Sequence, residues 1–183
     1  MRLAGGILRG RKLKVPNFVR PTQERVREAV FSMLREKLIG ARTLDLFAGS
    51  GALGLEAYSR GAASVCWVEQ NKQVFSVLKE NISCLCTENT TQTQLVFSDV
   101  FRYIRAHHKE NFDIIMVDPP YKEGLLEKML HALDSSSLLK SGAWIVFEQC
   151  VEDTVKVFEN WELLKNKSYG DARILIFGQR TNQ

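Results

Sequence analysis

The strongest chemical signal in the sequence is the run Asp118-Pro119-Pro120-Tyr121, directly after the apolar segment 114–117. The two prolines fix the backbone and lack N–H donors, so the Pro119 carbonyl oxygen remains an acceptor beside the Asp118 carboxylate. Two adjacent acceptors match the two N–H donors of a planar exocyclic amine, and Tyr121 offers a face on which a base can stack. The run predicts a site that binds and activates an amine of a nucleobase. The alternative is a proline-rich turn with a capping aspartate.

A second motif, residues 45–54, is rich in glycine and separates a predicted strand from a predicted helix. Gly49, Gly51 and Gly54 follow the pattern G-x-G-x-x-G, which permits a tight turn and a close approach of a ligand to the backbone. Glu69 ends the next predicted strand, where nucleotide-binding folds hydrogen-bond ribose hydroxyls. The loop therefore predicts a site for a cofactor that contains ribose.

Two acidic residues, Asp45 and Asp99, help to indicate which cofactor the loop binds. Asp45 stands where dinucleotide folds usually have an apolar residue, and an acid there suits a ligand with ammonium and sulfonium charges better than a pyrophosphate. We therefore expect S-adenosylmethionine rather than NAD. Asp99 follows the third predicted strand, and its position in line with Asp45 and Glu69 favours a hydrogen bond from an adenine amino group. The alternative is an N-cap of the helix that comes next.

The positive charge is concentrated at the N-terminus. The net charge is +4, yet residues 1–42 contain eleven basic and three acidic side chains. This asymmetry predicts a polyanionic partner bound mainly by the N-terminal segment, the alternative being a solvated charged face. The predicted RNA-binding residues are Arg2, Arg9, Arg11, Lys12, Lys14 and Arg20. Arg20 and Thr22 either line the pocket or act as linker and helix cap.

The composition is typical of one globular domain of 183 residues, 45% hydrophobic and 25% charged. Apolar runs are too short for a membrane span, which needs ~20 residues, and no secretory signal is visible. Four cysteines and three histidines follow no metal-binding spacing, so we expect reduced, buried or half-buried cysteines and no metal. We also expect a cytoplasmic monomer.

Apolar periodicity predicts alternating strands and helices after Gly40. This pattern is typical of a doubly wound α/β fold with a mostly parallel sheet. The predicted strands are 43–47, 64–69, 94–97, 112–117, 143–148 and an antiparallel pair, 161–167 and 172–178. The predicted helices are 22–38, 52–59, 72–85, 100–108, 125–133 and a short one at 152–158. Residues 3–15 predict a small hairpin.

The two motifs together resemble the class I S-adenosylmethionine-dependent amino-methyltransferases. Over nearly the whole chain, the sequence resembles the bacterial 16S rRNA guanine-N2-methyltransferase family. The resemblance rests on both motifs and on further segments: 2–6, 10–11, 20–22, 27–31, 55–57 and 59–62. It departs from the family at Gln70-Asn71, where a charged residue and an aspartate are frequent, and in the connection 84–93.

The resemblance implies a Rossmann-like sheet of seven strands with a basic N-terminal extension, 1–40, on a catalytic core, 41–183. It implies methyl transfer to the N2 amine of one guanine in 16S rRNA, within the small ribosomal subunit. The implied cofactor-binding residues are Asp45, Phe47, Gly49, Ser50, Gly51, Gly54, Glu69, Asp99 and Val100. The implied catalytic residues are Asp118, Pro119, Pro120 and Tyr121.

Three other functions remain open from the sequence. A DNA amino-methyltransferase shares the Asp118 motif, although the chain leaves little length for a recognition domain. An NAD-dependent oxidoreductase shares the glycine loop, although Asp45 argues against it. A non-enzymatic RNA-binding module would explain the basic N-terminus and leave residues 118–121 unexplained.

Overall fold

The computed structural model describes residues 1–16, 24–86, 92–106, 109–120, 124–156 and 158–180. Arg20, Thr22 and Tyr121, which the sequence singled out, lie outside these ranges. The helices are α1 (Glu24–Leu38), α2 (Ala52–Ser59), α3 (Lys72–Leu85), α4 (Val100–Arg105) and α5 (Leu125–Asp134). The strands are β1 (Arg42–Leu46), β2 (Ser64–Glu69), β3 (Gln92–Phe97), β4 (Phe112–Val117), β5 (Leu139–Cys150), β6 (Trp161–Tyr169) and β7 (Ala172–Gln179).

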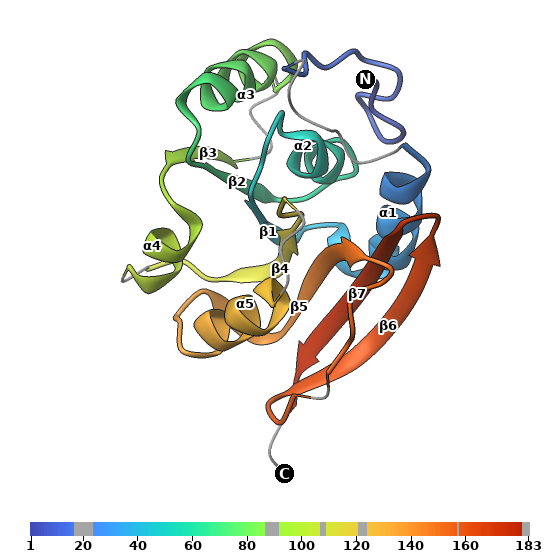
Figure 1. Ribbon diagram of the computed structural model, residues 1–183. Helices are drawn as coiled ribbons and strands as arrows, with labels where there is room; N and C mark the ends of the chain where they lie inside the picture. The colour runs from blue at the N-terminus through green and yellow to red at the C-terminus, as the bar shows by residue number, and fades with distance from the viewer. Residues whose placement is uncertain (17–23, 87–91, 107–108, 121–123, 157, 181–183) are drawn as a thin grey trace.

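The strands form one seven-stranded sheet in the order β3-β2-β1-β4-β5-β7-β6 (Figure 1). The first five are parallel, and β7 lies antiparallel between β5 and β6. The predicted α/β class, the seven strands and the closing antiparallel pair are thus confirmed. The order reverses at β1 and β4, whose carboxyl ends form the switch point where open α/β sheets bind ligands.

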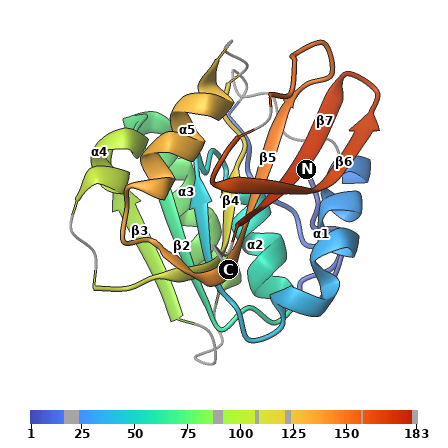
Figure 2. The same cartoon turned by 90° about the horizontal axis from the view of Figure 1, so that it is seen from below.

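Helices cover both faces of the sheet because its central strands are apolar on both sides. Ile114 and Met116 of β4 pack on the face covered by α1, α2 and α3, while Ile115 and Val117 pack on the face covered by α4 and α5. Figure 2 shows α1 and α2 on one side of the sheet and α4 and α5 on the other. Within the described ranges, no helix is long and apolar enough to cross a membrane.

The N-terminal hairpin is held together by backbone hydrogen bonds between its two arms. Arg2 and Lys12 form one isolated antiparallel bridge. The Leu3 N–H donates to the Arg11 carbonyl, and the Leu3 carbonyl accepts from the Gly10 N–H. Leu3 and Leu13 are buried and join the core on the α1–α3 side. The segment is therefore packed on the body of the molecule by its leucines, which turns most of its basic side chains outward.

The predicted short helix at 152–158 is wrong. Described residues there form a turn followed by irregular backbone. The carbonyl oxygen of Asp153 accepts from Arg173 Nη1 at 2.8 Å and from Gln149 Nε2 at 3.3 Å. Arg173 lies on β7, so its contact is a tertiary one, and tertiary packing overrides the local helical pattern here.

Other predicted boundaries shift by a few residues. The strand predicted from Gln94 begins at Gln92, because an edge strand tolerates the exposed polar residues that hid its start. The strand predicted at 143–148 extends from Leu139 to Cys150, where it pairs with β4 and β7. The helix predicted over 100–108 ends at Arg105, and residues 107–108 lie outside the described residues.

Candidate functional site

The glycine loop leaves β1 and enters α2 through backbone that glycine favours. Gly49 has φ 56° and Gly51, the N-cap of α2, has φ 87°. A Cβ built at Gly49 meets no atom closer than 3.9 Å, whereas one at Gly54 would lie 2.1 Å from Trp67 Nε1. Gly54 is therefore required for packing of α2 on β2, and Gly49 borders open space that a ligand can approach.

Phe47 is the described non-glycine residue with a positive φ, at 62°. That conformation is strained for an aromatic residue and is typical of turns at functional sites. It lies between the end of β1 and Gly49, and its half-buried ring packs against the core on the α4–α5 side. This backbone conformation turns the chain away from the direction of β1, directly after the strand ends at Leu46.

Glu69 joins the glycine loop to the start of α3. One carboxylate oxygen, Oε2, accepts from the Gly49 N–H at 3.0 Å, and Oε1 accepts from the Asn71 N–H at 2.7 Å. Asn71 in turn caps α3 by accepting from the backbone N–H groups of residues 73 and 74. Each oxygen of a carboxylate has capacity for another hydrogen bond, so ribose hydroxyls remain compatible with this geometry.

The buried side chain of Asp45 stabilises the glycine loop by a hydrogen bond. Its side chain is 1% exposed, and Oδ2 accepts from the Gly54 N–H at 2.8 Å. Burial raises the pKa of this carboxyl well above its usual range, and the nearby charges of Asp118 and Glu69 raise it further. The sequence predicts Asp45 to be a cofactor-binding residue, and the structure shows that it fixes the first turn of α2.

Three further predicted cofactor residues, Ser50, Asp99 and Val100, differ in their burial and in their contacts. Ser50 is buried, and its carbonyl oxygen accepts from Asn81 Nδ2. Asp99 is exposed and caps α4 by accepting from the Arg102 N–H at 2.8 Å, which was the alternative interpretation of this residue; its predicted contact with adenine stays a prediction. The Val100 side chain is buried in the core under α4, so only its backbone can face a ligand.

Residues 118–120 of the motif predicted to bind an amine lie beside this loop. Leu46 of β1 pairs with Val117 of β4, so Phe47 and Asp118 are the next residues along two adjacent parallel strands. Asp118 is half-buried, Pro119 is buried and Pro120 is exposed. The fold thus brings together two motifs that are about seventy residues apart in the sequence, as the switch point requires.

A cavity of about 500 Å³ opens next to Pro119. Its walls come from the start of α5, from the end of β5 and from the connection that follows β5. Two buried polar residues of this wall, Glu148 and Gln149, were not identified from the sequence. The only signal was a pair of polar residues at the end of an apolar strand, which is too general to indicate a site.

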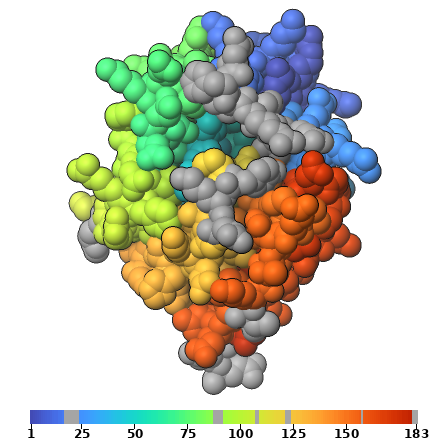
Figure 3. Space-filling view, in the orientation of Figure 1, coloured from blue at the N-terminus to red at the C-terminus, as the bar shows by residue number. Residues whose placement is uncertain are grey.

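The basic side chains within residues 1–14 are all exposed, and two of them, Arg2 and Lys14, also contact other residues of the chain. Arg9, Arg11 and Lys12 are exposed. The exposed Arg2 donates from Nη1 to the Gly10 carbonyl at 2.5 Å, and Lys14 forms an ion pair with Glu80 of α3. Figure 3 shows the N-terminal segment (dark blue) and α3 (green) at the same end of the molecule.

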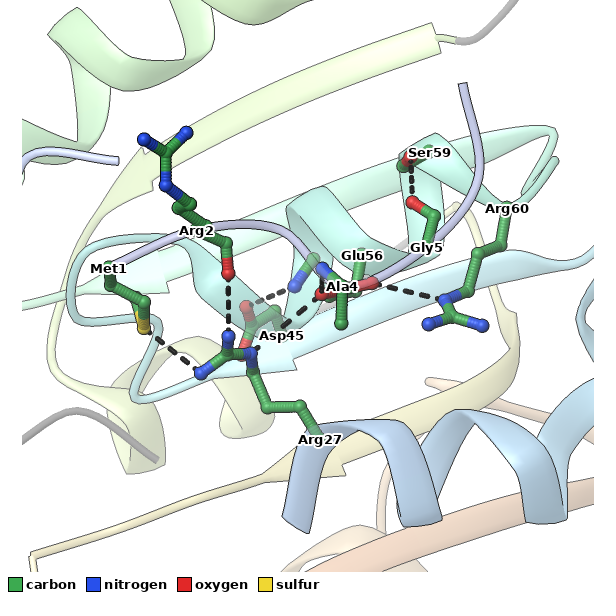
Figure 4. Close-up of polar contacts among 10 residues, drawn as sticks. Met1, Arg2, Ala4, Gly5, Arg27, Asp45, Glu56, Ser59 and Arg60 are labelled. Atoms are coloured by element: carbon green, nitrogen blue, oxygen red, sulfur yellow. Dashed lines mark hydrogen bonds and ion pairs between the residues drawn. The ribbon is translucent and has the colours of Figure 1, made fainter. Parts of the chain in front are cut away.

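Arg27 is one of the N-terminal basic residues, but it is buried and its contacts are within the chain. Its side chain is fully buried, 3.8 Å from Glu56 of α2, and Nη2 donates to the Arg2 carbonyl at 2.7 Å (Figure 4). Glu56 also accepts from the Ala4 N–H and from Arg60 Nε. This buried cluster attaches the N-terminal segment to α2, so the charge asymmetry overstates the positive charge that can face a polyanion.

Comparison with known proteins identifies the family. A family model described as conserved hypothetical protein 95 matches residues 1–178. The ribosomal RNA small subunit methyltransferase D of Escherichia coli K12 is 38% identical over 180 residues, covering 97% of this chain and 89% of the relative. The protein of that name from Buchnera aphidicola is 35% identical over 177 residues, covering 96% and 91%. The chain belongs to this family.

Solved structures agree with this membership. The Escherichia coli methyltransferase yhhF aligns with a TM-score of 0.87 at 37% identity, over 100% of this chain and 99% of that one. A hypothetical protein of Thermus thermophilus aligns with a TM-score of 0.81 at 30% identity, over 96% and 98%. The family resemblance and the methyltransferase fold expected from the sequence are confirmed.

Proposed function

We propose that this protein transfers a methyl group from S-adenosylmethionine to the exocyclic N2 amine of a guanine in 16S rRNA of the small ribosomal subunit. The observation that carries the proposal is the pairing of Leu46 with Val117. That register places the glycine loop and Asp118-Pro119 on adjacent strands at one edge of the sheet. Family membership and the names of the relatives support the substrate class.

The residues around the loop fit S-adenosylmethionine. Open space above Gly49 and the strained turn at Phe47 leave backbone accessible, while Glu69 and Asp99 provide carboxylates at the ends of the two neighbouring strands. Glu69 is suited to hold ribose hydroxyls, and Asp45 supports the loop from beneath. When bound, this cofactor supplies a methyl group on a positively charged sulfur.

The chain activates the amine by positioning it. The Asp118 carboxylate and the Pro119 carbonyl accept hydrogen bonds from its two N–H groups, which turns the nitrogen lone pair toward the cofactor side. As the nitrogen gains positive charge, the adjacent carboxylate stabilises it. Tyr121, outside the described residues, is proposed to stack on the base. No covalent enzyme intermediate is required for this chemistry.

The N-terminal segment is proposed to dock the RNA. The exposed side chains of Arg2, Arg9, Arg11 and Lys12 are suited to phosphate contacts, with Lys14 and Arg20 as further candidates. We propose that the chain works as one domain and as a cytoplasmic monomer. Because Leu3 and Leu13 pack this segment on the α1–α3 side, it presents a fixed basic surface rather than a loose tail.

The proposal is tested by methyl transfer from labelled S-adenosylmethionine to small-subunit particles, naked 16S rRNA and duplex DNA, with the modified nucleotide mapped. We expect one N2-methylguanosine in rRNA. Label in DNA adenine would support a DNA amino-methyltransferase instead. Absence of label in every substrate, with the cofactor bound, would favour a non-enzymatic RNA-binding module.

A further inference from the structure

The cavity beside Pro119 is separate from the residues that surround the cofactor loop. Its lining comes from 124–127, from 147–149, from 152–156 and from Phe158, in addition to Pro119. None of these described residues belongs to β1, β2, β3 or the glycine loop. Its volume of about 500 Å³ lies in the range of small-molecule sites. A base whose amine is held at Asp118 and Pro119 therefore has a cavity next to it that the cofactor does not need.

The charge of the cavity selects the kind of group it accepts. The lining contains four acids, Glu127, Glu148, Glu152 and Asp153, and one base, Lys156. Lys156 is paired with Glu127 at 2.9 Å, and the lining carries more acidic than basic side chains. A phosphate is disfavoured in such a site by like charge, whereas a neutral ring that donates hydrogen bonds is favoured. Leu126 and Phe147 add apolar surface for the ring itself.

Glu148 is the acid placed nearest the amine-binding motif by the sheet. Val117 pairs with Phe147 in the parallel register of β4 and β5, so Asp118 and Glu148 are the next residues along these strands. Glu148 is 8% exposed and lines the cavity. A buried carboxylate therefore lies one strand away from the carboxylate that holds the amine.

Guanine presents its donors along one edge. Its N2 amine carries two N–H donors, and the adjacent ring nitrogen N1 carries one more. Adenine has a lone pair at N1, which a carboxylate repels. We propose that Glu148 is a specificity-determining residue that accepts a hydrogen bond from N1–H of the target guanine seated in the cavity, while Asp118 and Pro119 hold its N2 amine. This inference rests on the proposed function and names how the base is chosen.

The first test compares the guanine with 2-aminopurine at the mapped position of the rRNA. 2-Aminopurine keeps the 2-amine and lacks N1–H. We expect the wild-type protein to methylate guanine with a kcat/KM ~10–100-fold above that for 2-aminopurine, since a site built for a donor rejects an analogue without it. Glu148→Gln should lower kcat/KM for guanine and bring this ratio toward one.

Two controls accompany the variant. Glu162→Gln makes the same change at an exposed position of β6, outside the cavity lining, and should keep the wild-type ratio. Titration of S-adenosylmethionine into Glu148→Gln should give the wild-type Kd. An unchanged base ratio in Glu148→Gln, with cofactor binding intact, overturns the inference.

A second test uses the wild-type protein alone and so does not depend on the folding of a variant. Particles carrying inosine, which keeps N1–H and lacks the amine, should inhibit methylation at least ~10-fold more strongly than particles carrying adenosine. Equal inhibition by the two would overturn the inference. Absence of methyl transfer to the guanine itself would instead overturn the proposed function, so the two failures are distinguishable.

Discussion

The side-chain amide of Asn81 on α3 donates from Nδ2 to the backbone carbonyl of Ser50 at 2.9 Å. The same Nδ2 donates to the Lys14 carbonyl at 2.9 Å, and Oδ1 accepts from the Lys14 N–H at 3.0 Å. One buried amide thus joins the N-terminal segment to the glycine loop. The surface proposed to dock RNA and the loop proposed to hold the cofactor share a hydrogen-bonded support.

Asn81→Ala should lower the free energy of unfolding by about 1–3 kcal/mol, because backbone groups of Lys14 and Ser50 lose their partner. The Kd for S-adenosylmethionine should rise several-fold as the loop loses its support. Urea unfolding and calorimetric titration measure the two effects. Ser83→Ala, on the exposed side of α3, should change neither; equal effects in both variants would contradict the role of Asn81.

Arg27→Met should lower the free energy of unfolding by about 1–3 kcal/mol, because buried Glu56 loses one of its two arginine partners and keeps only Arg60. It should also release the Arg2 carbonyl, so amide hydrogens of residues 1–13 should exchange faster. Denaturant unfolding and hydrogen exchange measure these changes. Arg25→Met, exposed on the same helix, should stay within ~0.5 kcal/mol of wild type.

Asp118→Ala should reduce kcat by at least ~100-fold, because the developing positive charge on the amine loses the carboxylate that stabilises it. The Kd for S-adenosylmethionine should remain close to wild type, since the glycine loop is untouched. Single-turnover methyl transfer and cofactor titration separate the two quantities. Near wild-type turnover in Asp118→Ala would show that the proposed mechanism is wrong.

Asp45 should make the cofactor-free protein less stable as the pH rises. Its pKa is raised in the folded state by burial, so above the pKa of an unfolded aspartate, about 3.9, the folded chain holds a proton that the unfolded chain has lost. Folding stability from this group is complete below that pH and declines as the pH rises toward the raised value. Asp45→Asn keeps an acceptor for Gly54 and does not titrate.

Melting temperatures of wild type and Asp45→Asn between pH 4 and pH 8 test this sign. The variant should gain stability relative to wild type as the pH rises. A difference that stays constant across the range would mean that Asp45 is ionised in the folded state throughout.

The basic surface should set the salt dependence of RNA binding. Replacing Arg9, Arg11 and Lys12 by glutamine should weaken binding and lower the slope of log K against log salt by ~0.7 for each phosphate that is no longer neutralised. Replacing three exposed lysines elsewhere, Lys109, Lys128 and Lys167, should leave the slope unchanged. Equal slopes for the two triple variants would exclude the N-terminal segment as the docking element.

Much of the fold and part of the site followed from local patterns. The glycine loop, the acids at strand ends and Asp118-Pro119 are readable because each lies in a short motif whose residue types have a direct backbone or hydrogen-bonding reason. Apolar periodicity placed the strands because strands buried on both faces read as continuous apolar runs. The helix predicted at 152–158 was wrong because Arg173 of β7, twenty residues away, donates to the Asp153 carbonyl, a contact that no local pattern shows.

Residue types and their spacing were therefore enough for the α/β class and the uneven charge, and for the proposals that the glycine loop holds the cofactor and that residues 118–121 bind the amine. Which charges are buried depended on tertiary packing, since Arg27 belongs to the basic end of the chain and is wholly enclosed beside Glu56 of α2 and the first residues. The residues that lie next to Asp118 in space also depended on tertiary packing. Register between β4 and β5 brings Glu148 beside Asp118, and register is set by contacts between strands rather than by any local pattern.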